Sequence, residues 1–205
     1  MNLFHLLTEK PWAPALGGVA GLRHGSTFSL PTATLGLRVF LAVVTVLFSL
    51  LIVAYHDRMA VADWRPLAEP WLLWLNTAVL ILSSVALQWA RVAARRGEID
   101  DVRTGLLAGG VCAAAFLAGQ LLAWQQLAAL GYFAATNPAI GFFYLITGLH
   151  ALHLLGGLVA WGRTTAKLWR GVAVAQLRLS VELCAVYWHF LLAVWLLLFG
   201  LLLST

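Results

Sequence analysis

Five long apolar runs, joined by short connections, constrain this chain more than any motif in it. They cover about residues 35–55, 70–91, 104–129, 139–162 and 179–203. Each run is close to or longer than the roughly 20 residues that a helix needs to cross the apolar core of a bilayer. The chain is 62% hydrophobic and only 10% charged, which is typical of membrane proteins. The sequence therefore predicts an all-α integral membrane bundle of five transmembrane helices, residues 35–205, preceded by a cytoplasmic N-terminal segment, residues 1–34.

The distribution of basic residues predicts how the bundle is oriented. Eleven of the 13 lysines and arginines precede or open the first run or lie in the second and fourth connections. Only Arg58 and Arg65 lie between the first and second runs, where acidic residues outnumber them. Basic residues next to spans mark the cytoplasmic side. We therefore expect the N-terminus in the cytoplasm, the C-terminus in the periplasm, a multi-pass protein of a bacterial inner membrane, and no nucleic-acid partner.

Ionisable side chains interrupt the last two runs. His150 and His153 lie three residues apart in the fourth run, and Glu182 and His189 lie seven apart in the fifth. Both spacings place the two members on one helix face. Ionisable groups at membrane depth are costly and usually face protein rather than lipid. We therefore expect each of these side chains to have a polar partner inside the protein.

Depth along the helix axis suggests which groups meet. At about 1.5 Å per residue, His150 and His189 come to similar heights on oppositely running helices. His153 and Glu182 both come closer to the cytoplasmic edge. If the short fourth connection makes the last two helices neighbours, His150 would lie near His189, and His153 near Glu182. The sequence thus predicts a structural polar network of four residues: His150, His153, Glu182 and His189.

Two other interpretations of these residues remain open. Two histidines at equal depth on facing helices could ligate a haem, as in a haem-bearing membrane anchor. Glu182 could carry protons, but the apolar residues that follow His189 supply no relay toward the far side. No catalytic residue and no metal-ligating set is predicted, because the histidines and cysteines are too few and too far apart for a copper or haem–copper centre.

Smaller features predict local structure. Asn137 is a candidate N-cap with Pro138 as the first helical residue. Gly105 and Gly109 are four apart, which lets two helix backbones approach closely in a membrane. The first run carries almost no polar residue and is expected to be the most exposed to lipid.

Taken together, the last two runs resemble subunit III of the haem–copper respiratory oxidases. The matching pieces are Phe143–His150 with His153 and Gly156, then Glu182 followed by Tyr187-Trp188-His189-Phe190 and Trp195. Earlier matches are Leu75-Asn76-Thr77, Ser83-Ser84, Phe116 and Gly119-Gln120. The resemblance covers about residues 35–203 and is to the five-helix bacterial form of that family.

The resemblance implies a role and its partners. Such a subunit carries no redox cofactor and packs directly against subunit I, which holds haem and copper and reduces O₂, in a complex that also contains subunit II. It supports assembly, sustained turnover and proton uptake, and it binds phospholipid; the lipid-binding candidates here are Arg178, Trp188 and His189. The electron donor is expected to be cytochrome c. Subunit III of a quinol oxidase, or an accessory protein of a nitric oxide reductase, is the alternative.

Two positions depart from the family pattern. A carboxylate commonly stands two residues after the Tyr-Trp-His-Phe motif, where this chain has Leu192. A glutamate commonly stands three residues after the glutamine of the third run, where this chain has Ala123. The seven-helix members also have two further helices that wall a lipid cleft, so that a cleft in a five-helix member would need walls from another subunit.

Overall fold

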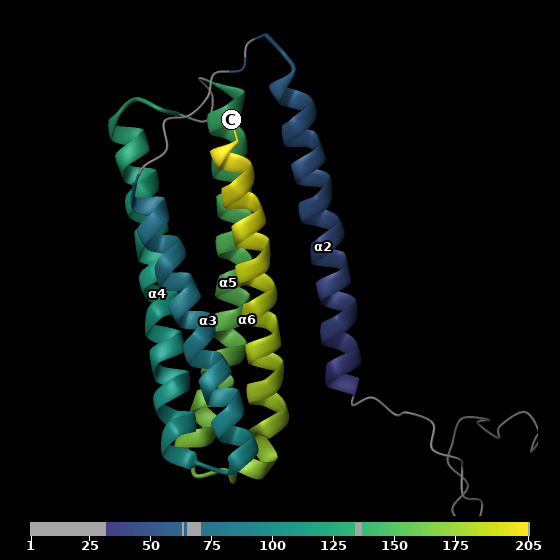
Figure 1. The fold of residues 1–205 in the computed structure, drawn as a ribbon, viewed down its shortest axis with the longest axis vertical. Coiled ribbons are helices and arrows are strands. Elements are labelled where there is room, and N and C mark those ends of the chain that lie inside the picture. The colour runs from purple at the N-terminus through teal and green to yellow at the C-terminus, as the bar shows by residue number, and fades with distance from the viewer. Residues whose placement is uncertain (1–31, 63, 65–70, 134–136, 205) are drawn as a thin grey trace, which may run out of the picture. The chain divides into compact units, whose positions relative to one another are not determined.

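The computed structural model describes residues 32–62, 64, 71–133 and 137–204, and within them every regular element is an α-helix. The helices are α2 (Thr32–Met59), α3 (Leu72–Arg96), α4 (Ile99–Ala129), α5 (Pro138–Trp169) and α6 (Val174–Leu203) (Figure 1). All five are long and apolar enough to cross a membrane, which confirms the predicted fold class. The predicted N-terminal segment lies outside the described residues, except that residues 32–34 already belong to α2.

The helix ends follow from local sequence signals. The Asn137 side chain accepts a hydrogen bond from the backbone N–H of Ala139 at 3.0 Å, and Pro138 opens α5, which confirms the predicted cap. Gly97 ends α3 with φ of 80°, a left-handed conformation that costs glycine little. Its backbone N–H donates to the Ala93 carbonyl. The Gly97 cap lets α3 turn tightly into α4.

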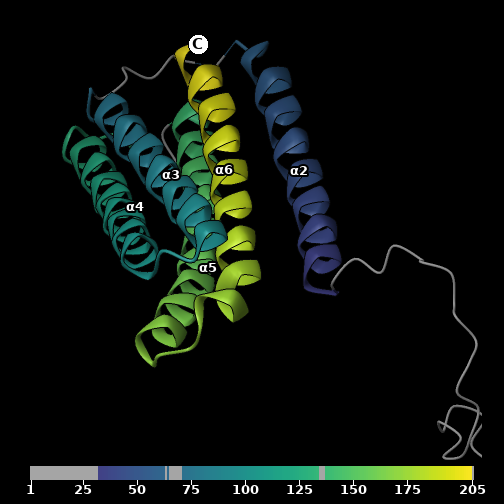
Figure 2. The ribbon, with the colours of Figure 1, turned by 60° about the horizontal axis from the view of Figure 1, so that its bottom comes forward.

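Helices α3 and α4 form the closest pair in the fold, lying side by side in both views (Figures 1 and 2). A Cβ atom added to Gly105 would lie 2.9 Å from the Ala86 carbonyl oxygen, and one added to Gly109 would lie 2.7 Å from Leu87 Cγ. The Ser83 hydroxyl donates to the Gly109 carbonyl at 2.7 Å. The close approach predicted for the two glycines is therefore confirmed, and α3 is the helix that makes it.

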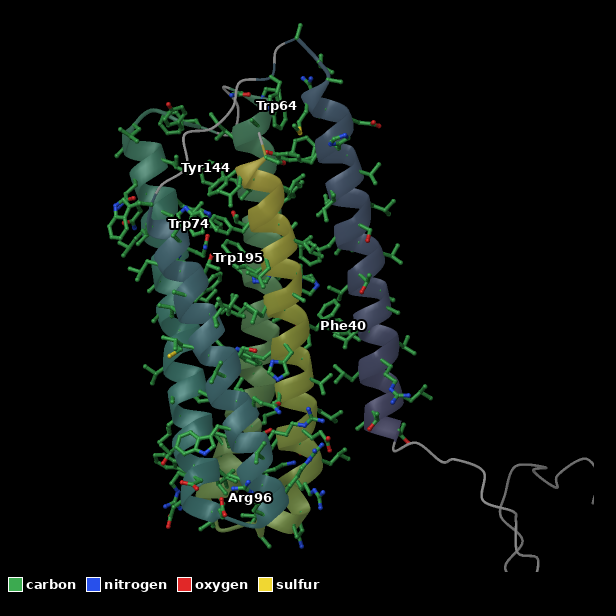
Figure 3. The ribbon with its side chains drawn as sticks, viewed as in Figure 1. Phe40, Trp64, Trp74, Arg96, Tyr144 and Trp195 are labelled. Atoms are coloured by element: carbon green, nitrogen blue, oxygen red, sulfur yellow. The ribbon has the colours of Figure 1, made fainter. Side chains whose placement is uncertain are left out.

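Helix α2 is the least buried of the five. Only 11% of its most apolar stretch is buried within the structure, against 33–44% for the other helices. It packs against α5 and α6, and aromatic rings take part in both contacts. The Phe40 ring lies 6.0 Å from Tyr187 of α6, and the Tyr55 ring lies 5.6 Å from Phe142 of α5. Phe40 lies on the side of α2 that faces the other helices (Figure 3). Helix α2 is thus the most exposed helix of this chain, and that its surface faces lipid stays a prediction.

The basic connections meet at one end of the helices. Arg96 lies there, whereas Trp64 and Tyr144 lie toward the opposite end (Figure 3). The arginines of the α3–α4 turn and those of the α5–α6 turn belong to this end because the four helices run alternately up and down. It is called the basic end below.

Candidate functional site

A ladder of three polar pairs joins α3 to α6. The Trp195 indole N–H donates to Thr77 Oγ1 at 2.9 Å, Ser84 Oγ lies 2.5 Å from His189 Nδ1, and Arg91 donates to Glu182 at 2.6 Å. Thr77, Ser84 and Arg91 are spaced by seven residues, so they share one face of α3. From one pair to the next, the residue number rises by seven in α3 and falls by six or seven in α6, as expected for two antiparallel helices. We call this set the α3–α6 ladder.

Glu182 forms the rung nearest the basic end. Its Oε1 accepts hydrogen bonds from Arg91 at 2.6 Å and from Arg95 at 2.5 Å. Arginines one turn apart thus hold one carboxylate between them, and charge-assisted bonds of this kind are the stronger ones. The side chains of Arg91, Glu182 and Arg95 are 23%, 31% and 46% exposed, so the group lies at the rim of the helix bundle. The predicted pairing of Glu182 with His153 is wrong.

His189 forms the middle rung. Its Nε2 lies 3.0 Å from Gln88 Oε1, which can only accept, so Nε2 carries a proton. In the neutral ring Nδ1 then accepts from the Ser84 hydroxyl. Both ring nitrogens are therefore engaged by α3. The predicted approach of His189 to His150 is wrong, because His189 faces α3.

The two histidines of α5 face different surroundings. His153 donates from Nδ1 to the Leu149 carbonyl at 2.8 Å, within its own helix, and its ring lies 5.5 Å from Phe48 of α2. The His153 carbonyl accepts from the Tyr187 hydroxyl at 2.9 Å. His153 thus lies between α2 and α6 rather than near a carboxylate.

His150 is fully buried in a box of aromatic rings. The ring centroids of Trp195, Phe116 and Phe48 lie 5.1, 5.9 and 6.4 Å from that of His150. Neither ring nitrogen has a hydrogen-bond partner among the described residues. The four residues predicted as one network are therefore divided. Helix α3 holds Glu182 and His189, whereas His150 and His153 both lie against Phe48 of α2.

The haem interpretation requires two imidazoles that face each other across a porphyrin. His189 is turned to Ser84 and Gln88, whereas His150 packs against Trp195 and Phe116. The two rings thus do not form a bis-imidazole site. Among the residues that the structure describes, His, Cys, Asp and Glu side chains also form no group of three that could hold a metal ion.

A groove lies between α2, α5 and α6 toward the basic end. Its volume is about 430 Å³. Gly156, Gly157 and Ala160 line one side, Tyr187 and Trp188 the other, and Arg163 and Lys167 supply positive charge. Gly157 matters here because a Cβ atom on it would lie 2.7 Å from the Tyr187 ring. The missing side chain lets α6 bring its two aromatic rings against α5.

The predicted lipid contacts occupy different positions relative to this groove. Trp188, which has no exposed surface, contributes its buried wall. His189 is turned away from the groove to α3. Arg178 is exposed in the second turn of α6 and does not line the groove. Sequence reasoning did not identify Arg163 and Lys167 in this role.

Sequence reasoning also missed the α3 partners of the ladder. Their signal was present, because Thr77, Ser84 and Arg91 repeat at the same interval as Glu182 and His189. Two rows of polar residues with this spacing can pair along their whole length when the two helices lie side by side and run in opposite directions. Trp195, the third member of the α6 row, lies six residues after His189 and is usually counted as apolar. Its pairing with Thr77 was therefore not predicted from the sequence.

Comparison with known proteins gives the family of this architecture. The family model described as "Cytochrome c oxidase subunit III" matches residues 27–203. The chain is 31% identical to cytochrome c oxidase subunit 3 of Thermostichus vulcanus over 176 residues, which are 82% of this chain and 85% of that protein. It is 33% identical to the probable cytochrome c oxidase subunit 3 of Nocardia farcinica over 129 residues.

One further relative has a different electron donor in its name. It is the cytochrome bo(3) ubiquinol oxidase subunit 3 of Pseudomonas aeruginosa, 26% identical over 125 residues. The matches to the Nocardia and Pseudomonas proteins span 61% and 60% of the length of those relatives.

Proposed function

Because this chain belongs to the cytochrome c oxidase subunit III family, we propose that it is an accessory membrane subunit of a respiratory terminal oxidase. In this proposal the chain carries no redox group of its own. Haem and copper belong to the catalytic subunit I, which reduces O₂ and against which this chain packs directly, and subunit II is part of the same complex. The membrane is the plasma membrane of a bacterium, with the basic end of the bundle in the cytoplasm.

The observation that carries the proposal is the engagement of His189 and Glu182 by α3. Both ring nitrogens of His189 and the Oε1 of Glu182 are held by side chains of the same bundle. These hydrogen bonds fix the register of α3 against α6 and leave no ring nitrogen of His189 for a porphyrin iron. A rigid scaffold is what an accessory subunit contributes to its neighbour.

Cytochrome c is the proposed electron donor of the complex. The family model and the relatives with the higher identities carry that donor in their names. The ubiquinol oxidase relative favours quinol as the second candidate. The surface that binds the electron donor belongs to other subunits. A cytochrome c oxidase and a quinol oxidase can therefore contain similar subunits III.

A bound phospholipid is part of the proposal. The groove between α2, α5 and α6 combines an apolar wall, which includes Trp188, with Arg163 and Lys167 toward the basic end. Acyl chains fit the apolar part, while a phosphate near the membrane surface would pair with the two basic side chains. Arg178 is exposed at the same end and could reach a headgroup from outside the groove.

Purification of the intact complex tests the function. A C-terminal affinity tag on this chain, used in mild detergent, should recover a subunit that shows the absorbance of a haem–copper centre, together with oxygen consumption driven by reduced cytochrome c. Recovery of the chain without any haem-containing partner would contradict the proposal. Recovery of a complex that oxidises quinol and not cytochrome c would change the donor and leave the accessory role intact.

A further inference from the structure

Three polar side chains in the interior of the bundle have atoms without partners. They are Asn76 on α3, Gln120 on α4 and His150 on α5, which are 3%, 1% and 0% exposed. Among the described residues, no hydrogen-bond partner reaches Asn76 Nδ2, either polar atom of Gln120 or either ring nitrogen of His150. Buried polar atoms in proteins nearly always have a partner, and in an apolar membrane interior the lack of one is especially costly.

Contacts between the helices link the surroundings of these three side chains. The Phe116 ring lies 5.9 Å from His150 and 5.0 Å from Trp195, and Gln120 follows Phe116 by one turn on the same face of α4. Trp195 donates to Thr77, the neighbour of Asn76. A Cβ atom on Gly119, the neighbour of Gln120, would overlap the Asn76 carboxamide. We call Asn76, Gln120 and His150 the polar layer.

The side chains of the polar layer cannot satisfy one another. The amide groups of Asn76 and Gln120 have two N–H donors each, and a neutral imidazole has one. The acceptors without a partner are Gln120 Oε1 and the unprotonated nitrogen of His150. The Thr77 hydroxyl donates to the Leu73 carbonyl and accepts from Trp195, which leaves it one lone pair and no donor. The layer therefore has more donors than acceptors and needs a ligand that can accept.

We propose that the polar layer is a binding site for ordered internal water. A water molecule accepts two hydrogen bonds and donates two, and buried waters typically bond to two to four otherwise unpaired polar groups. Water in this place would accept from the two amides and donate to Gln120 Oε1 and His150. It would tie α3, α4 and α5 together at one depth. This inference does not depend on the proposed function.

A density map of the intact complex at a resolution that shows waters gives one test. The expected result is density within hydrogen-bonding distance of both Gln120 and His150, enclosed by Phe116 and Trp195. The proposal is overturned if the layer holds no such density and the side chains point their polar atoms to backbone groups instead.

Radiolytic hydroxyl labelling of the complex in nanodiscs gives a second test, because radicals formed from a bound water react with the nearest side chains. Phe116 and Trp195 should be labelled although they are fully buried, and Tyr55, which is 2% exposed on α2, should be labelled far less. The double variant Gln120→Leu/His150→Leu should lose the label on Phe116 and Trp195. Labelling of these rings no stronger than that of Tyr55, or labelling that persists in the double variant, would overturn the proposal. If the double variant does not assemble, the comparison with Tyr55 in the unaltered protein decides.

Discussion

Ser84 and His189, 105 residues apart in the chain, lie 2.5 Å apart at the middle of the α3–α6 ladder. The rung toward the basic end is Arg91 with Glu182, and the rung toward the other end is Thr77 with Trp195. Apolar surface gives no preference for one register over another in lipid, because the acyl chains are as apolar as leucine. Polar rungs at seven-residue intervals supply that preference. The ladder therefore specifies how α6 packs on α3.

Replacement of Glu182 by leucine should destabilise the subunit, since Arg91 and Arg95 would lose their shared carboxylate. Because these side chains are partly exposed, we expect a cost of about 1–2 kcal/mol, between the values of exposed ion pairs and of buried charge-assisted bonds. Thermal unfolding followed by tryptophan fluorescence measures the effect. Glu98→Gln, at an exposed position before α4, is the matched control and should have little effect.

The Thr77–Trp195 rung should show pairwise coupling. Trp195→Phe removes the indole donor and Thr77→Val removes its acceptor, and each change leaves most of the apolar volume in place. A double-mutant cycle should give a coupling free energy of about 0.5–1.5 kcal/mol. Effects of the two changes that are simply additive would mean that this hydrogen bond contributes nothing to the packing of α6.

Alanine at Gly105 should force α3 and α4 apart, because its Cβ would lie 2.9 Å from the backbone of Ala86 and Ala90. Overpacking of this kind costs about 1–3 kcal/mol. Gly36→Ala in α2 is the control, since nothing lies within 4 Å of the added atom, and it should be neutral or slightly stabilising. Equal stability of the two variants would be incompatible with the close α3–α4 contact.

The groove should lose anionic lipid when its charge is removed. In the double variant Arg163→Gln/Lys167→Gln, the anionic phospholipid retained by the purified complex should fall, as measured by mass spectrometry of the extracted lipid. Arg96→Gln/Arg170→Gln, which removes the same two positive charges outside the groove, is the control. Retention that falls equally in both variants would indicate a general effect of surface charge and not a lipid site in the groove.

Some features could be predicted because each depends on residues close together in the sequence. They are the spans, the α5 cap and the close helix approach at Gly105 and Gly109. The partners of Glu182 and His189 could not be predicted from depth alone. Depth gives the height of a side chain along the membrane normal, but rotation about the helix axis decides which neighbour it faces. That rotation is set by packing of whole helices, and α6 turns both residues toward α3 rather than toward α5, the helix that precedes it. His150 and His153 show the same limit, since both rings lie against Phe48 of α2 and neither lies against a residue that was predicted to pair with it.

The central claim is that His189 is a helix-packing residue held by Ser84 and Gln88 and binds no haem. Its most direct test is the absorbance spectrum of this chain after it has been separated from the other subunits. We predict no Soret band in the separated chain, and an unchanged haem spectrum in a complex that carries His189→Phe. A stoichiometric Soret band that follows this chain and is lost in His189→Phe would contradict the claim.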